Sequence, residues 1–190
     1  MSEPAARDAT SSPFRLLSLD GGNRAAVQAI LRDTAVFHPY EIDTALEVFD
    51  AFVANPDQDY FALGAFTQDG GLVGYVCYGP TPCTAGTFDL YWIAVSPTVQ
   101  RTGAGTLLLL EVERRLARSG ARLVVIETSS LPRYEATRTF YARRGYRVAA
   151  RVTDFYADGD DRLIYVKRIG TSDTRRKRKW KPGKISSDKA

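Results

Sequence analysis

The order of apolar and polar positions along the chain predicts a mixture of strands and helices. Residues 23–37 and 40–54 place apolar side chains at helical spacing, with Pro39 between the two segments. Residues 59–80 are typical of two strands joined by the turn Asp69-Gly70-Gly71. Further strands are expected at residues 14–20, 87–95, 122–128, 146–155 and 162–168, and further helices from the turn at 100–105 to about Ser119 and over 131–145.

This order of elements predicts the fold class α/β, with helices layered on a mixed sheet. Residues 122–128 are apolar enough for a central, buried strand. The strand–helix–strand unit from residue 87 to 128 is expected to be a right-handed parallel crossover. Gly120 and Gly145 follow the two later helices at the position where glycine commonly ends a helix.

Length and composition are those of a globular protein with one domain. The chain has 190 residues, of which 44% are hydrophobic and 25% are charged. No apolar run approaches the roughly 18 residues that a membrane-spanning helix needs, and residues 1–13 lack the pattern of a signal peptide. We therefore expect a flexible N-terminus (1–13), a domain over residues 14–169, a cytoplasmic location and no membrane partner.

Positive charge is concentrated in the last segment. Residues 171–190 carry eight Lys or Arg against two Asp, a net charge of +6, whereas the whole chain has a net charge of +4. The rest of the chain is thus slightly acidic. Residues 170–190 are expected to be a disordered basic tail, with nucleic acid as an alternative partner through Trp180 and the surrounding cations.

Metal chemistry is not expected. The chain contains two cysteines, Cys77 and Cys83, and one histidine, His38, which lies between the first two predicted helices. This set is too small for a zinc site. The two cysteines are interpreted as thiols, with a disulfide as the alternative.

Two glycines occur where a helix is about to begin. The stretch Gln100-Arg101-Thr102-Gly103-Ala104-Gly105-Thr106 precedes a strongly helical run, although glycine inside a helix costs about 1 kcal/mol relative to alanine. Backbone N–H groups at a helix N-terminus bind anions, and glycine lets a phosphate approach them. Turn geometry alone is the alternative reason for the glycines. The turn is neither a dinucleotide fingerprint nor a P-loop.

The context of this turn resembles the GNAT family of acetyl-CoA-dependent N-acetyltransferases. The turn follows the strand at 87–95, and the stretch Phe140-Tyr141-Ala142-Arg143-Arg144-Gly145-Tyr146 comes about 40 residues later. The resemblance covers roughly residues 14–169. It implies a mostly antiparallel sheet of about six to seven strands with four helices and a splay between the fourth and fifth strands.

The resemblance also implies where acetyl-CoA binds. The backbone of the turn would hold the pyrophosphate, and the strand edge would pair with the pantetheine arm. The residues implied are Ile93, Ala94, Val95, Gln100, Arg101, Thr102, Gly103, Ala104, Gly105 and Thr106. Tyr134 occupies the position where the family often has an Asn that contacts the arm. Its hydroxyl either replaces that Asn or lines the acceptor pocket.

Three residues are candidates for catalysis. Tyr141 matches the family tyrosine near the CoA sulfur, where a phenol can protonate a departing thiolate. An acceptor amine must lose a proton before attack, and the candidate bases are Asp89 in the fourth strand and Glu127 at the end of the fifth. A water relay without a dedicated base is the third alternative.

A further group of acids is expected between the last two strands. Asp154, Asp158, Asp160 and Asp161 accompany Tyr156 there, either to attract a cationic amine or as a solvated loop. The predicted function is direct transfer of acetyl from acetyl-CoA to a primary amine of a small molecule or peptide. A binding module for acyl-CoA or nucleic acid without turnover is the alternative. The acceptor, other acyl groups and the oligomeric state, a homodimer included, stay open.

Overall fold

The computed structural model describes residues 12–56 and 58–170. The basic tail and nearly all of the N-terminal segment expected to be flexible lie outside the described residues. The seven strands are β1 (Arg15–Ser18), β2 (Phe61–Phe66), β3 (Leu72–Pro80), β4 (Thr87–Val95), β5 (Leu123–Ser129), β6 (Arg147–Ala157) and β7 (Asp160–Arg168). The helices are α1 (Arg24–Asp33), α2 (Pro39–Ala54), α3 (Ala104–Arg118) and α4 (Glu135–Arg143), with short 3-10 turns at Gly21–Asn23, Pro97–Val99 and Pro132–Tyr134.

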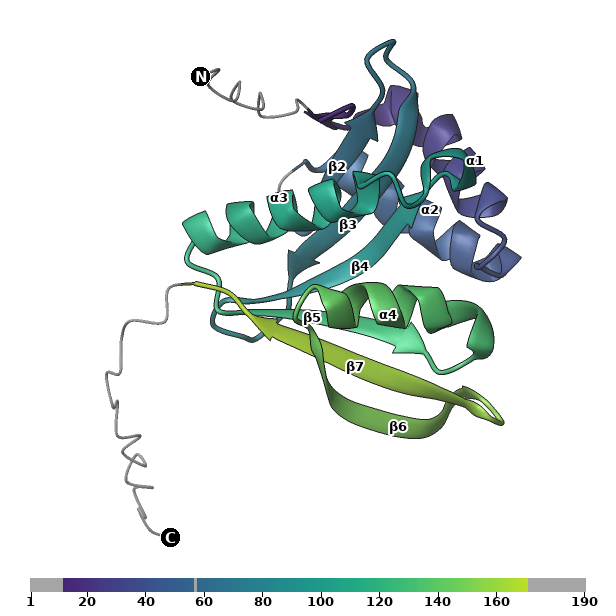
Figure 1. The fold of residues 1–190 in the computed structure, drawn as a ribbon. Coiled ribbons are helices and arrows are strands. Elements are labelled where there is room, and N and C mark those ends of the chain that lie inside the picture. Colours follow the sequence, from purple (N-terminus) through teal and green to yellow (C-terminus); the bar gives the residue numbers. More distant parts are fainter. Residues whose placement is uncertain (1–11, 57, 171–190) are drawn as a thin grey trace, which may run out of the picture.

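The strands form one twisted sheet in the order β1-β2-β3-β4-β5-β7-β6 (Figure 1). All neighbours are antiparallel except β4 and β5, which are parallel and are connected through α3. A parallel pair needs such a crossover, because a hairpin cannot join two strands that run the same way. The expected α/β class, the seven strands, the four helices and the parallel unit over residues 87–128 are confirmed.

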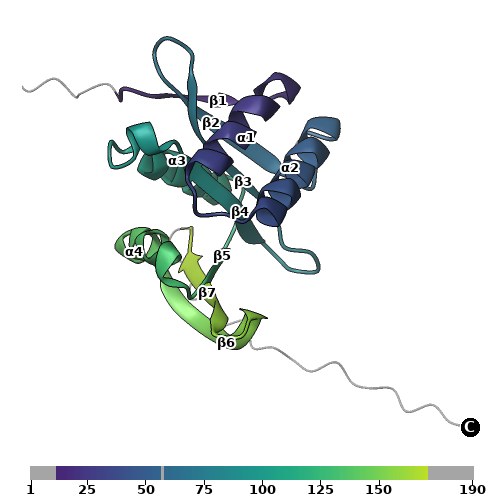
Figure 2. The same cartoon turned by 90° about the vertical axis from the view of Figure 1, so that its right-hand side faces the viewer.

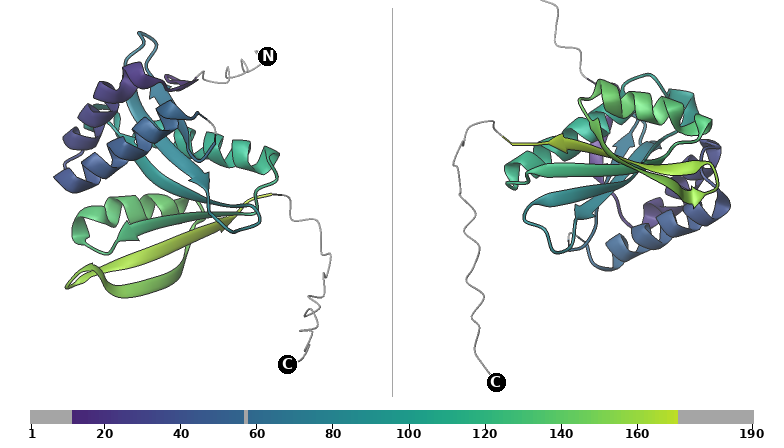
Figure 3. Two further views of the ribbon diagram at one scale, coloured as in Figure 1. Left: turned by 180° about the vertical axis from the view of Figure 1, so that it is seen from behind. Right: turned by 90° about the horizontal axis from the view of Figure 1, so that it is seen from below.

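Helices cover the two faces of the sheet unequally (Figures 2 and 3). On one face, α1 and α2 pack on β2, β3 and β4 through a cluster that includes Val27, Leu31, Phe49 and Tyr75. On the other face, Leu108 and Val112 of α3 share a second core with Tyr141 of α4. The second core spans both halves of the sheet, whereas the first belongs to the N-terminal half alone.

The sheet divides between β4 and β5. Their ladder contains four residue pairs, from Thr87–Leu123 to Leu90–Ile126, and the strands separate beyond them. Tyr91 lies at that point and has no partner in the β3–β4 register, where Cys77 pairs with Trp92 and Tyr78 pairs with Leu90. A bulge of this kind bends its strand and ends regular pairing. The expected splay between the fourth and fifth strands is therefore confirmed.

Two boundaries differ from the sequence interpretation. Of the expected helix over 131–145, Pro132–Tyr134 form a 3-10 turn and Glu135–Arg143 form α4; Pro132 takes the first position of the turn, where its missing N–H is tolerated. The predicted polar loop at 156–161 is shorter than expected, since β6 and β7 continue to a tight turn in which Gly159 has φ 78°. Cys77 and Cys83 are free thiols, as interpreted. Within residues 12–56 and 58–170, no helix has the length and apolar character needed to span a bilayer.

Candidate functional site

A groove of about 940 Å³ follows the separated edge of β4 toward the start of α3 and along α4. Eight residues of the predicted cofactor set line it: Ile93, Ala94, Val95, Gln100, Arg101, Gly103, Gly105 and Thr106. Thr102 and Ala104 belong to the same turn but do not line the groove, and Tyr134 lies in the neighbouring cavity.

The turn before α3 presents its backbone to the groove. Arg101 and Gly103 both have positive φ, 66° and 102°, and the Gln100 side chain donates to the Val95 carbonyl over 3.2 Å. In the part of the chain that the structure describes, the N–H groups from Gly103 to Thr106 donate to no acceptor. These are the free donors of a helix N-terminus, so the turn fits an anion such as a phosphate.

Arginines add positive charge to the same groove. Arg143 and Arg144 at the end of α4 line it together with Arg101. Arg144 donates to the Thr106 hydroxyl, and its buried Nε has no hydrogen-bond partner among the described residues. The sequence interpretation missed these two α4 arginines as site residues, although they stand within the stretch that carried the resemblance. Their charge favours a multiply charged anion.

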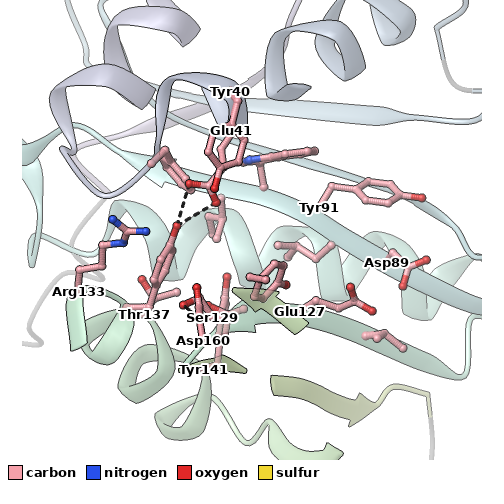
Figure 4. Close-up of a pocket in the computed structure, with 18 residues that line it drawn as sticks. Tyr40, Glu41, Asp89, Tyr91, Glu127, Ser129, Arg133, Thr137, Tyr141 and Asp160 are labelled. Atoms are coloured by element: carbon pink, nitrogen blue, oxygen red, sulfur yellow. Dashed lines mark hydrogen bonds between the residues drawn. The ribbon is translucent and has the colours of Figure 1, made fainter. Parts of the chain in front are cut away.

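A second cavity, of about 430 Å³, lies where the two halves of the sheet separate (Figure 4). Seven aromatic residues, four carboxylates and one arginine are prominent in its lining. They are Phe37, Tyr40, Tyr91, Trp92, Tyr134, Tyr141 and Tyr156; Glu41, Asp89, Glu127 and Asp160; and Arg133. Phe37, Ile93, Arg133 and Thr137 line both the groove and the cavity, so the two spaces meet at these residues.

Tyr141 reaches the cavity from α4 while its ring packs in the core beside Tyr146 and Tyr165, each at a centroid distance of 6.0 Å. The side chain is 4% exposed, and burial raises its pKa well above the usual value of a phenol. No acceptor for its hydroxyl occurs within residues 12–56 and 58–170. Tyr141 therefore presents a protonated hydroxyl to the cavity.

The two candidate bases line the same cavity but have different partners. Asp89 Oδ2 accepts a hydrogen bond of 2.7 Å from the Thr81 hydroxyl, which is a neutral donor. Glu127 forms an ion pair with Arg162 of β7. The structure thus brings Tyr141, Asp89 and Glu127 together, and it leaves Asp89 without a cationic partner among the described residues.

Glu41 is a cavity residue that the sequence interpretation missed. Its carboxylate accepts from the His38 backbone N–H over 2.7 Å, as in a capping box at the start of α2. It also accepts from the Tyr134 hydroxyl over 3.1 Å (Figure 4). Burial, followed by the charge of Glu41, raises the pKa of Tyr134. The only sequence signal was the helix start itself, which does not reveal a contact 93 residues away.

The acids of the β6–β7 hairpin take different places. Asp160 and Tyr156 line the cavity, and Asp160 Oδ1 accepts from the Ser129 hydroxyl over 2.5 Å. Asp161 forms an ion pair with Arg151 and accepts a hydrogen bond from the backbone N–H of Asp154. That N–H, and then Arg151, lower the pKa of the Asp161 carboxyl. Asp158 does not line the cavity. Among the described residues, no group of three or more His, Cys, Asp or Glu is arranged to hold a metal ion.

Comparison with known proteins agrees with this geometry. The model of the acetyltransferase (GNAT) family matches residues 25–146. A protein from Desulfovibrio desulfuricans assigned to the GNAT family of acetyltransferases is 40% identical, with 82% of this chain and 97% of that chain covered and a TM-score of 0.74. Among curated proteins, no relative was found.

Two more distant structures share the fold. The ribosomal-protein-S18-alanine N-acetyltransferase from Escherichia coli is 22% identical, with 84% of this chain and 96% of that chain covered and a TM-score of 0.67. An N-acetyltransferase from Thermoplasma acidophilum, solved in complex with coenzyme A, is 19% identical, with coverages of 82% and 98% and a TM-score of 0.63.

Proposed function

The chain belongs to the GNAT family of acetyltransferases, and from this membership we propose that it moves an acetyl group from acetyl-CoA directly to a primary amine. The groove would hold the cofactor and the adjoining cavity would hold the acceptor. The observation that carries this assignment is the junction of the two spaces at Ile93 and Thr137, beside the cavity that Tyr141 lines. A thioester bound at this junction would lie next to an amine bound in the cavity. Such positioning of the two reacting groups supplies much of the catalysis.

The cofactor residues have separate tasks in this proposal. The free N–H groups from Gly103 to Thr106 bind the pyrophosphate, assisted by Arg143 and Arg144. The β4 edge from Ile93 to Val95 pairs with the amides of the pantetheine arm, since β5 no longer pairs with it there. An N–H of β4 near the bulge at Tyr91 polarises the thioester carbonyl.

Tyr141 acts as the general acid. Its raised pKa keeps the hydroxyl protonated until the thiolate departs, and the proton then passes to sulfur. We assign the base to Asp89, either directly or through a water molecule, because Glu127 is engaged by Arg162. The amine nitrogen bonds to the acetyl carbon, the carbon–sulfur bond breaks, and the products are an amide and free CoA.

The catalytic unit is assigned to residues 14–169, which contain every strand and helix described. A cytoplasmic location is part of the proposal and is supported by the free thiols Cys77 and Cys83, the second of which is exposed. The chain's oligomeric state has no role in this assignment.

Calorimetric titration with acetyl-CoA and CoA, followed by an assay of thiol release with a panel of amines, tests the function. We expect binding of both nucleotides and amine-dependent release of CoA. Binding without release for any amine would favour the alternative of a binding module. Absence of binding would overturn the proposal.

A further inference from the structure

The cavity assigned to the acceptor carries excess negative charge. Its lining includes four carboxylates and one guanidinium, Arg133, and a second guanidinium, Arg162, pairs with Glu127. Two negative charges are therefore left uncompensated by these groups. A ligand with two positive charges would balance them, whereas a monocation would balance one.

The three carboxylates without an arginine partner among the described residues, Glu41, Asp89 and Asp160, are held by neutral donors, and Asp89 is the assigned base. Glu41 accepts from the His38 N–H and the Tyr134 hydroxyl, and Asp160 accepts from the Ser129 hydroxyl and the Ser130 N–H through the same oxygen. Such donors fix the position of a carboxylate without cancelling its charge. In the residues that the structure describes, neither Glu41 nor Asp160 forms an ion pair.

Glu41 and Asp160 act at one common place. Glu41, Tyr156 and Asp160 line the one cavity together. Consistent with this, burial and then the charges of Asp160 and Glu41 raise the pKa of the Tyr156 hydroxyl. Tyr156 and Tyr40 add aromatic surface to this part of the cavity. Aromatic rings beside carboxylates suit an alkylammonium ion, because the ring faces attract the cation and the methylene groups.

A separate observation indicates where the reacting amine of the ligand would lie. The Tyr141 residue is buried in the core, and its hydroxyl lines the same cavity and has no hydrogen-bond partner within the described chain. The hydroxyl can therefore bond to a group that binds in the cavity. The cavity thus combines a reacting end at Tyr141 with a second, anionic place at Glu41 and Asp160. Its volume of about 430 Å³ suits a small molecule.

We propose that the acceptor is an aliphatic diamine or longer polyamine, whose second ammonium group binds between Glu41 and Asp160 beside Tyr156. This inference rests on the proposed acetyl transfer and names its substrate class. One amine loses its proton, attacks the acetyl carbon and becomes an amide, while Tyr141 protonates the departing thiolate. The other amine stays charged throughout. The product has one positive charge fewer than the substrate, so its attraction to the cavity is weaker and its release is favoured.

The test compares 1,4-diaminobutane with n-butylamine, which has the same carbon skeleton and a single charge. Thiol release by the full chain with saturating acetyl-CoA gives kcat/KM for each, corrected for the fraction of free amine. We expect the diamine value to be at least about tenfold higher, as a charged hydrogen bond to the second ammonium would provide. Equal values, or a preference for the monoamine or for a peptide amino terminus, would overturn the inference.

Variants identify the residues responsible. Glu41→Gln and Asp160→Asn keep the shape of the two side chains and one acceptor oxygen in each, so each should raise KM for the diamine about tenfold without changing KM for butylamine. The controls are Glu47→Gln on α2 and Asp158→Asn in the β6–β7 turn, which remove the same charge outside the cavity. They should change neither value.

The outcomes separate the two proposals. Equal effects of Glu41→Gln or Asp160→Asn on both amines would indicate a structural role and would contradict the inference alone. Turnover of monoamines without a preference for diamines would leave acetyl transfer intact and reject the substrate class. No thiol release with any amine, in a protein that binds acetyl-CoA, would reject both.

Discussion

The Tyr134 hydroxyl donates to Glu41 over 3.1 Å and so joins the segment before α4 to the start of α2. The two residues belong to opposite halves of the molecule, and both line the cavity where β4 and β5 separate. This contact fixes both side chains at the place where an acceptor would enter. The role of Tyr134 can be measured by removing its hydroxyl.

Tyr134→Phe should raise KM for the diamine about fivefold, because Glu41 loses a hydrogen bond worth about 1 kcal/mol that helps to position it. The dissociation constant of acetyl-CoA, measured by calorimetry, should stay unchanged, since Tyr134 lines the cavity and does not line the groove. The opposite pattern, with weakened cofactor binding and an unchanged amine KM, would assign the hydroxyl to the pantetheine arm.

Tyr141→Phe should lower kcat about 100-fold, the usual size of a lost general acid, while the affinity for acetyl-CoA is retained. The substitution keeps the ring that packs against Tyr146 and Tyr165, so the fold should be preserved. Tyr165→Phe is the matched control, because it removes a hydroxyl from the same aromatic cluster outside both cavities. Full activity of the Tyr141 variant would remove it from the mechanism.

Gly103→Glu should weaken acetyl-CoA binding at least about tenfold, because it places a like charge at the anion-binding turn. The residue has φ 102°, so any side chain also costs about 1 kcal/mol of backbone strain. Gly70→Glu separates the two effects. It introduces similar strain at φ 93° in the β2–β3 turn, away from the groove, and should lower the melting temperature without changing calorimetric affinity.

Asp89→Asn should slow acetyl transfer most at neutral pH and progressively less as the pH rises. An alkyl amine has a pKa of about 10, so the fraction that needs no base increases about tenfold with each pH unit. Glu127→Gln should give a smaller loss, since its carboxylate is paired with Arg162. The pH profile of kcat/KM measures both. A pH-dependent loss in the Glu127 variant alone would exchange the two roles.

Glu111 on α3 predicts a stability change with pH. Hydrogen bonding by Arg114, followed by Arg115, lowers the pKa of Glu111 to about 2. Since this lies below the unfolded value of about 4.3, the stabilisation is complete above that value and is lost as the pH falls toward 2. Glu111→Gln should therefore reduce the free energy of unfolding at pH 7, by at most about 1 kcal/mol because both arginines are largely exposed. Urea unfolding should show that the difference in the free energy of unfolding between variant and parent is smaller at acidic pH than at neutral pH. An unchanged difference would refute the ion pair as its source.

Local patterns were sufficient to predict most strands and helices and the glycine-containing turn before α3, whereas the resemblance to the GNAT family was needed to assign a pyrophosphate to that turn. Thr87–Val95 was anticipated to the residue, because β-branched and aromatic residues occupy it and a turn bounds it on each side. Gly103 and Gly105 indicated a special turn before α3, and the structure gives Gly103 a left-handed conformation with φ 102°. The length of the β6–β7 hairpin was misjudged, since polar residues that usually mark a loop here continue the strands to Ala157 and Asp160.

The cavity where β4 and β5 separate could be predicted only in part: Tyr141, Asp89, Glu127 and Asp160 were candidates from the sequence, whereas Glu41 was not. Glu41 and Tyr134 are 93 residues apart, and Asp160 is positioned by Ser129, 31 residues earlier. Each of these acids has an ordinary local explanation as a helix-start or turn residue. Their shared location follows from the separation of β4 and β5, which depends on the bulge at Tyr91 and not on any short motif.

The four-pair ladder between β4 and β5 gives the cofactor a structural part in the folded state. Beyond Leu90 and Ile126 the two strands no longer pair, and the backbone groups of the β4 edge can engage an extended chain of amides. A ligand that binds there would stabilise the folded state relative to the unfolded state by about 2.7 kcal/mol at a hundredfold excess over the dissociation constant. The concentration of the acyl donor would thus set the stability of the protein as well as its rate.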